Sequence, residues 1–471
     1  MSVSARKRYI LYFVVLISIL IFTKGVVAKD IETEPTLTIG LGYSDNINLD
    51  HDDVKSSAYT LIAPAVRFIK EGSRVKTQLD YKMNGYTYAS DSDLNNTQHN
   101  LNALLKSELL AQSIFLDINA NISQELLNNS QNSSPDGASG SNNLTQTYTY
   151  GVSPYWKKQW KNYATSEFKY EYNELIYSSE DEANNNNGGD NSRANQITLM
   201  IESGKNFNRY FWNFDYTYNT TDYEINNDTR SESYKLQLGY HYSKKLDFTF
   251  TTGYEDYSDS REESGGGWRT GILWNPTSRT NFEFELGHRF FGNTYVFDFK
   301  HQNRRLTWHF RYDDTITNTR NQIINNNQQE NPDGITPPLS DFTVQYYLSR
   351  RFAGDISYRH KKSAFILGVF NEKRYFQDSN TLDEENTGFD FTWNLAVGRR
   401  MNMSSQMVWR RLKDNAGTSS QEQKSFRWSF NRYLSATLTG VISLSYSTNN
   451  ADLITNDYTE NALSIGLTKR F

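Results

Sequence analysis

The side chains that most often carry catalysis or hold metal ions are sparse in this sequence. It has seven histidines and no cysteine. No two histidines have the spacing that would place both on one face of a helix, so a transition-metal site is not expected. No Gly-x-Ser-x-Gly segment offers a nucleophile elbow, and Gly265-Gly266-Gly267 is not followed by the Lys-Ser/Thr of a phosphate loop. We therefore predict a protein that is not an enzyme and that has no metal ion or cofactor.

Charged side chains instead alternate with apolar ones. This spacing indicates weak binding of solutes by a polar surface and not catalysis. A wall of polar groups would bind the hydroxyls of a solute weakly and at many sites. Arginine is denser in the second half of the chain, where it would balance the charge of an anionic solute. We predict that the following residues face a water-filled lumen: Arg74, Lys76, Asp80, Lys82, Asp215, Asp247, Glu283, Glu285, Arg289 and Arg311.

β-Strands are the elements that present side chains in this way, because neighbouring residues of a strand point to opposite faces. Between Leu37 and Tyr43 every second residue is apolar, and the same period of two returns throughout the chain, as from Tyr210 to Tyr218. No stretch of comparable length fits a helical stripe as well. Strands with one apolar and one polar face are typical of a transmembrane β-barrel, whose outer surface meets lipid while its lumen is wet.

The last strand, which ends the chain on an aromatic residue, shows this pattern clearly. Leu463, Ile465, Leu467 and Phe471 share the apolar parity. This ending resembles the closing strand of bacterial outer-membrane barrels. The resemblance implies that the last strand pairs with the first and is read by the β-barrel assembly machinery. We predict that these four residues form the assembly signal.

Short and long connections alternate between the predicted strands. The long ones, such as Asp45–Ser56 and Asn128–Leu144, are rich in Asn, Asp, Ser and Gly, and the tight Gly292-Asn293 turn is an exception. The short ones carry basic pairs such as Lys244-Lys245, whereas the long ones carry acidic clusters. Short periplasmic turns and long extracellular loops are typical of outer-membrane barrels. Basic side chains are also stabilised at a rim of anionic lipid head groups.

The fold class that follows is all-β, a transmembrane antiparallel up-and-down β-barrel of about 22 strands, within a range of roughly 18 to 24. The strand count is ambiguous over residues 342–370. Arg350-Arg351 and Lys361-Lys362 compete for one turn, because single-chain bacterial barrels have an even number of strands and both termini in the periplasm. The sequence leaves that choice open.

The lumen of a barrel of this size is usually filled. The sequence contains no plug domain. The long loop Thr319–Ser340 could fold inward, a partner could fill the lumen, or the lumen could be wide.

Three segments are expected along the chain. Residues 1–28 have a basic start, an apolar run and small residues before Lys29, which is the layout of a secretory signal peptide. An uncleaved anchor helix is the alternative. Residues 29–35 form a short periplasmic N-terminal linker, and residues 36–471 form the outer-membrane β-barrel.

Overall composition fits this reading. The mean hydropathy of −0.73 would suit a soluble or disordered chain, yet 14% of the residues are aromatic, which is too many for disorder. A barrel reconciles the two values, because only every second strand residue meets lipid. The net charge of −5 is mild for this length and argues against nucleic acid as a partner.

Three stretches carry a family resemblance: Leu41-Gly42-Tyr43-Ser44-Asp45-Asn46-Ile47, then Arg289-Phe290-Phe291-Gly292-Asn293-Thr294-Tyr295 followed by Arg304-Arg305, and Leu348-Ser349-Arg350-Arg351. Together they resemble the outer-membrane β-barrel proteins associated with exopolysaccharide gene clusters of the PEP-CTERM/exosortase type, within a broader β-barrel porin superfamily. The resemblance implies a role in exporting or assembling an extracellular polysaccharide. It transfers no functional residues.

The leading hypothesis is therefore an outer-membrane channel for export of an extracellular polysaccharide. A general or small-solute diffusion porin is the alternative, followed by a structural surface protein and a barrel enzyme. Expected partners are outer-membrane lipids and lipopolysaccharide, the β-barrel assembly machinery and periplasmic polysaccharide-export components. The expected location is the outer membrane of a Gram-negative cell, with both termini periplasmic.

Overall fold

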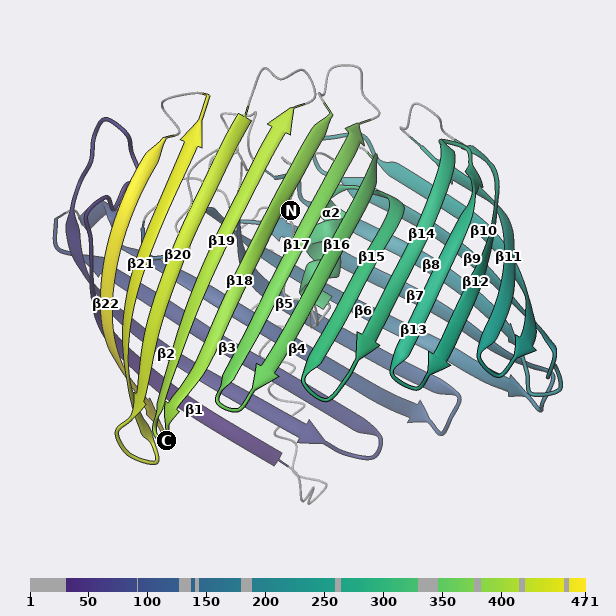
Figure 1. The fold of residues 1–471 in the computed structure, drawn as a ribbon, viewed down its shortest axis with the longest axis horizontal. Coiled ribbons are helices and arrows are strands. Elements are labelled where there is room, and N and C mark those ends of the chain that lie inside the picture. Colours follow the sequence, from purple (N-terminus) through teal and green to yellow (C-terminus); the bar gives the residue numbers. More distant parts are fainter. Residues whose placement is uncertain are drawn as a thin grey trace.

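The chain closes into a ring of 22 antiparallel strands in the computed structural model (Figure 1). The structure describes residues 31–90, 92–126, 137–139, 144–178, 189–258, 264–328, 346–376, 383–414, 420–452 and 457–471. The predicted signal peptide, residues 1–28, lies outside them. Each strand pairs with its neighbours in sequence, and the first strand also pairs with the last. The predicted fold class is confirmed.

Each strand crosses the barrel from one rim to the other, and the strands follow one another around the ring in chain order. Their bounds are β1 Ile31–Ser44, β2 Ser57–Glu71, β3 Val75–Tyr88, β4 Asn96–Leu110, β5 Ile114–Leu126, β6 Leu144–Trp160, β7 Ala164–Tyr177, β8 Ser192–Ser203, β9 Tyr210–Tyr223, β10 Thr229–Ser243, β11 Leu246–Tyr257, β12 Ser264–Thr277, β13 Thr280–Arg289, β14 Gly292–Gln302, β15 Leu306–Thr317, β16 Tyr347–His360, β17 Ser363–Phe376, β18 Glu384–Gly398, β19 Met401–Asp414, β20 Ser420–Tyr433, β21 Leu438–Ala451 and β22 Tyr458–Arg470.

The outer surface of the barrel is apolar. Leu41 and Ile465 are 66% and 54% exposed, and they oppose each other in the register of β1 and β22. Paired residues of neighbouring strands point to the same face, so the register carries one apolar parity around the ring. Exposed apolar side chains on most of the strands would be unfavourable in water, and they suit a lipid environment.

The seam between β1 and β22 closes the barrel. Ile39 opposes Leu467 on the outer face, and on the inner face the hydroxyls of Thr38 and Thr468 lie 2.8 Å apart. The amide of Phe471 donates to the carbonyl of Pro35 at 3.0 Å. Pro35 therefore belongs to β1, which begins at Ile31, although the sequence places residues 29–35 in a linker.

The two rims of the barrel differ in their connections. On one, here called the short-turn rim, the strands join through two to six residues, and Ile31 and Phe471 lie at this rim. The other, the long-loop rim, carries the longer connections and one tight turn between β13 and β14, where Gly292 has a φ of 113°.

The ambiguous turn near residue 350 is settled by this arrangement. Lys361 and Lys362 form the turn between β16 and β17, with Lys361 at a φ of 50°. Arg350 and Arg351 lie inside β16, where they oppose Lys373 and Glu372 of β17.

Two short helices stand apart from the strands. The 3₁₀ turn η1, Ser92–Leu94, precedes β4, and the α-helix α2, Thr319–Gln328, follows β15. Figure 1 shows α2 inside the ring of strands. Among the described residues no separate domain fills the lumen.

No helix in the described part of the chain is long and apolar enough to cross a membrane.

Candidate functional site: the lumen and its inward-folded segments

The face of each strand opposite the apolar parity lines the lumen. On β3, Lys76, Asp80 and Lys82 alternate with the outward Leu79 and Tyr81. Register places six more of the sequence-predicted residues on the inner face: Asp215, Asp247, Glu283, Glu285, Arg289 and Arg311. Arg74 differs from them. Because β3 begins at Val75, Arg74 lies in an exposed turn at the short-turn rim and not on the wall.

Ion pairs link neighbouring strands along this inner wall. Glu255 accepts from Arg289 at 2.6 Å and forms an ion pair with Lys235 at 3.0 Å. Arg269 lies 3.3 Å from Glu285. Both signs of charge are therefore interspersed, and a solute in the lumen would meet no continuous surface of one sign.

Helix α2 crosses from its own strands to a distant part of the wall. The guanidinium of Arg320 donates to the hydroxyl of Ser192 at 2.9 Å and to the carbonyl of Asn173 at 3.2 Å, and also to the side-chain oxygen of Asn173. Ile323 packs against Leu175 and Tyr177. These receiving residues belong to β7 and β8, whereas α2 follows β15, so the helix narrows the lumen.

The start of α2 is fixed by a capping residue. The side-chain oxygen of Asn318 accepts from the amide of Asn321 at 2.9 Å, which satisfies one of the free amides of the first turn. The amide group of Asn318 also donates to the Tyr223 hydroxyl on β9 at 3.4 Å. The same residue therefore caps the helix and ties it to the wall.

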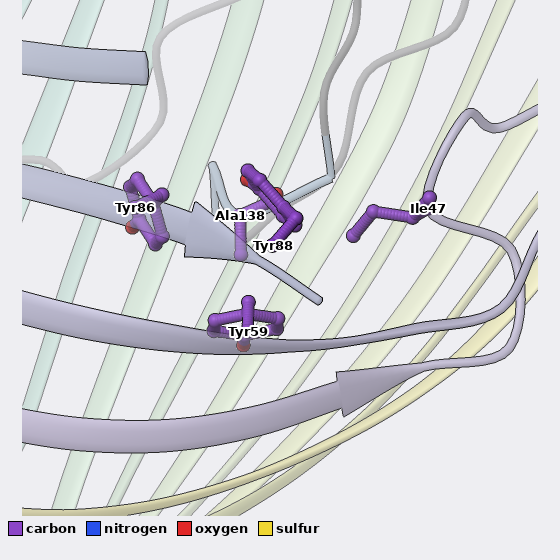
Figure 2. Close-up of a cluster of buried hydrophobic side chains, with 5 residues drawn as sticks. All are labelled: Ile47, Tyr59, Tyr86, Tyr88 and Ala138. Atoms are coloured by element: carbon purple, nitrogen blue, oxygen red, sulfur yellow. The ribbon is translucent and has the colours of Figure 1, made fainter. Parts of the chain in front are cut away.

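A tyrosine cluster forms a second narrowing, near the long-loop rim (Figure 2). Tyr59 of β2 meets Tyr86 and Tyr88 of β3, with ring centroids 5.9 Å apart in both pairs. Ile47 from the β1–β2 loop and Ala138 from the β5–β6 connection pack against them and are 0% and 3% exposed.

The loop that supplies Ile47 is shaped by its own carboxylates and amides. The amides of Asp52 and Asp53 donate to the Asp50 carboxylate at 2.9 and 3.2 Å. These bonds favour the charged form and lower the pKa of Asp50. Asn46 closes the turn by donating to the Asp50 carbonyl at 2.8 Å.

The described segment 137–139 reaches across to the seam. Tyr88 donates its hydroxyl to the Ala138 carbonyl, and Ser139 donates to Glu460 of β22. Glu460 is 2% exposed and also accepts from Ser44 at 2.7 Å and from Ser447 at 3.2 Å. Three hydroxyls thus satisfy one buried carboxylate, which anchors the connection to the closing strand.

A buried charge cluster lies on the inner face of β16 to β18. Arg374, which is 1% exposed, contacts Glu372 at 2.8 Å and Glu384 at 3.2 Å. Ser349 donates its hydroxyl to the second oxygen of Glu372 at 2.6 Å. Glu372 is thereby bonded through both of its oxygens.

The arrangement can bind and restrict solutes, and the described residues contain no cluster of three or more His, Asp or Glu that could hold a metal ion. Sequence reasoning missed Arg320, Glu460 and the residues that receive α2. The sequence could have indicated Glu460, because it is an acidic residue on a strand face that otherwise carries small residues such as Ala462 and Ser464. Asn173 and Ser192 had none, because only closure of the ring brings them to α2.

No family model matches the chain, and no curated protein sequence matches it. Solved barrels are similar in fold. The FrpB iron transporter from Neisseria meningitidis (F5-1 variant) in its apoprotein form has a TM-score of 0.52 and 9% identity, over 95% of this chain and 82% of that chain. The siderophore receptor PirA from Acinetobacter baumannii has a TM-score of 0.48 and 10% identity, over 95% and 81%. At such identity the likeness shows the fold alone.

Proposed function

We propose that the protein is an outer-membrane channel that exports an extracellular polysaccharide. The observation that carries the proposal is the way the lumen is narrowed. In the described residues, loop segments held by hydrogen bonds enter it, and such segments can move aside without displacing a folded domain. The family resemblance of the sequence points to the same class of cargo.

The chemistry of the wall suits a hydroxyl-rich polymer. Ion-paired and amide side chains offer donors and acceptors at every level, so a sugar chain would exchange one weak hydrogen bond for another as it advances. Arginines on the inner face, such as Arg311 and Arg427, would balance carboxylates or other anionic groups on the polymer.

The two rims give the channel a direction under this proposal. The short-turn rim carries Lys244-Lys245 and Arg399-Arg400 and would face the periplasm, where export components deliver the polymer. The long-loop rim, with the tyrosine cluster just below it, would face the exterior.

Deletion of the gene tests the proposal. We expect polysaccharide to accumulate in the periplasm and to be lost from the cell surface, with recovery when the wild-type gene is restored. Unchanged surface polysaccharide in the deletion strain would contradict an export role.

A small-solute diffusion porin is the second candidate, and the two inward-folded segments favour it, because both occupy part of the lumen. Planar bilayers separate the candidates. A diffusion porin would give a steady conductance that long oligosaccharides do not block, in a protein whose deletion leaves the polysaccharide unchanged. A polymer channel would be blocked by such oligosaccharides in a length-dependent way.

A further inference from the structure

The outer face of β16 to β20 carries a group of cations that a lumen function does not explain. Register assigns Arg350, Lys373, Arg411, Lys413 and Lys424 to the outward parity, near the long-loop rim. Arg350 opposes Lys373, and Lys373 and Lys413 flank Glu385 in the same register row. Arg411 and Lys424 follow on β19 and β20. We call these five residues the outer basic row.

Three of the five cations in the row have a carboxylate within 4 Å, and the first of these pairs is Arg350 with Asp314 at 3.8 Å. Lys373 lies 3.9 Å from Glu385, whose oxygen already accepts from Asn371 at 2.9 Å. Glu422 lies 3.2 Å from Lys424 and accepts from the Trp409 indole at 2.6 Å. Neither Arg411 nor Lys413 has a carboxylate of the described chain within 4 Å.

Two outward cations near the long-loop rim on the other side of the barrel each have a carboxylate partner. Arg230 lies 2.8 Å from Asp256, and Arg193 lies 3.4 Å from the 5% exposed Glu174. Arg411 and Lys413 differ from these two arginines in having no such partner among the described residues.

An apolar band lies directly beside the outer basic row. Phe389, Met407 and Phe426 are 38%, 47% and 36% exposed on the same outer face. Met407 and Arg411 are four residues apart on β19, a span of about 13 Å along the strand. Arg350 also lies over the Tyr375 ring, 5.2 Å from its centroid, on the long-loop side of the row.

We propose that the outer basic row binds the phosphates of lipopolysaccharide, with the acyl chains of the same molecule on the apolar band below. A lipid with two phosphates and several acyl chains matches cations and apolar side chains in this order, and guanidinium groups bind phosphate through paired hydrogen bonds. The inference rests on the outer-membrane placement proposed above, with the long-loop rim outward. It is independent of what passes through the lumen.

The test compares two double variants of the detergent-purified full chain. R411Q/K413Q removes two cations of the row, both on β19. R410Q/R427Q removes two arginines from the inner face of β19 and β20, and Arg410 is adjacent in sequence to Arg411. Binding of purified lipopolysaccharide is measured by native mass spectrometry and by titration. A heat-induced shift in gel mobility confirms that each variant is folded, and single variants R411Q and K413Q serve if the double variant is not.

We expect R411Q/K413Q to bind lipopolysaccharide at least fivefold more weakly, and R410Q/R427Q to bind within twofold of wild type. Dephosphorylated lipopolysaccharide should bind the wild type as weakly as the intact lipid binds R411Q/K413Q. Equal losses in both double variants, full binding of the dephosphorylated lipid, or displacement by an equal concentration of phosphatidylglycerol would overturn the proposal. A defect in polysaccharide export would not affect these outcomes.

Discussion

At the scale of single residues, the inner wall contains charges that are buried and paired. Arg374 is almost inaccessible, and its guanidinium is compensated by Glu372 and Glu384. Removing a charge from water is costly, so a buried group of this kind is stable only while all of its partners remain. Loss of the Glu372 charge would leave the buried Arg374 cation with Glu384 as its one remaining carboxylate in these contacts.

We expect Glu372→Gln to lower the free energy of unfolding by about 3–5 kcal/mol, the usual cost of breaking a buried ion pair by removing one partner. Glu385→Gln is the control, because Glu385 lies on the outer face with 36% of its side chain exposed, and its loss should cost about 1 kcal/mol or less. Urea-induced unfolding of the barrel in lipid vesicles measures both. Equal destabilisation by the two changes would contradict the claim that burial makes the loss of Glu372 more costly than the loss of Glu385.

At the scale of elements, α2 is a helix that its sequence only weakly favours. It is rich in Asn, and Arg320 lies in its first turn, where a positive charge opposes the helix dipole. The contacts of Arg320 and Ile323 with β7 and β8 outweigh these preferences. The position of α2 therefore depends on the wall that receives it.

We expect Arg320→Ala to release α2 from the wall and to raise the mean single-channel conductance, with larger fluctuations, because Ser192 and Asn173 lose their donor. The matched control is Asn325→Ala, a change at an exposed position of the same helix that should leave the conductance unchanged. Planar-bilayer recordings of both variants provide the measurement. A conductance unaltered by Arg320→Ala would show that α2 does not limit the lumen.

The elements themselves could be predicted from the sequence to a large extent. Period-two alternation gave the strands, and the length of the Thr319–Ser340 loop marked the connection that contributes α2, although residues 329–340 lie outside the described part. The choice between Arg350-Arg351 and Lys361-Lys362 could not be made, since both are basic pairs near strand-like runs. Pairing across the ring decides it, and pairing across the ring is not a local property of the chain.

The contacts inside the lumen could not be predicted for the same physical reason. Arg320 meets Asn173 across 147 residues of sequence, and Ser139 meets Glu460 across 321. Alternation determines which face a residue occupies. It does not determine which distant residue lies opposite once the ring has closed.

At the scale of the whole molecule, closure depends on two strands from opposite ends of the chain. Phe471 is 72% exposed on the outer face, and its amide bonds to Pro35. The assembly role predicted for Leu463, Ile465, Leu467 and Phe471 stays a prediction, and their common outward parity places them where a membrane-embedded partner could reach them.

We expect deletion of Phe471 to reduce the amount of folded barrel in the membrane at least tenfold, because both the seam hydrogen bond and the terminal aromatic side chain are lost. Phe471→Trp keeps both features and should assemble normally. The heat-modifiable fraction in membrane extracts measures assembly. Normal insertion of the truncated chain would contradict an assembly signal at this position.

The seam between β1 and β22 would allow the chain termini to be moved to another turn of the barrel. Phe471 and Pro35 are already hydrogen-bonded, so a short peptide could join the two ends, and new ends could be opened in the turn at Lys361-Lys362. Such a circularly permuted chain would keep every strand pairing, yet β22 would become an internal strand and β16 the terminal one. The finished ring has no first strand. A strand is first or last only in the order of synthesis. The permuted chain would therefore separate the stability of the closed barrel from the assembly that depends on which strand is last.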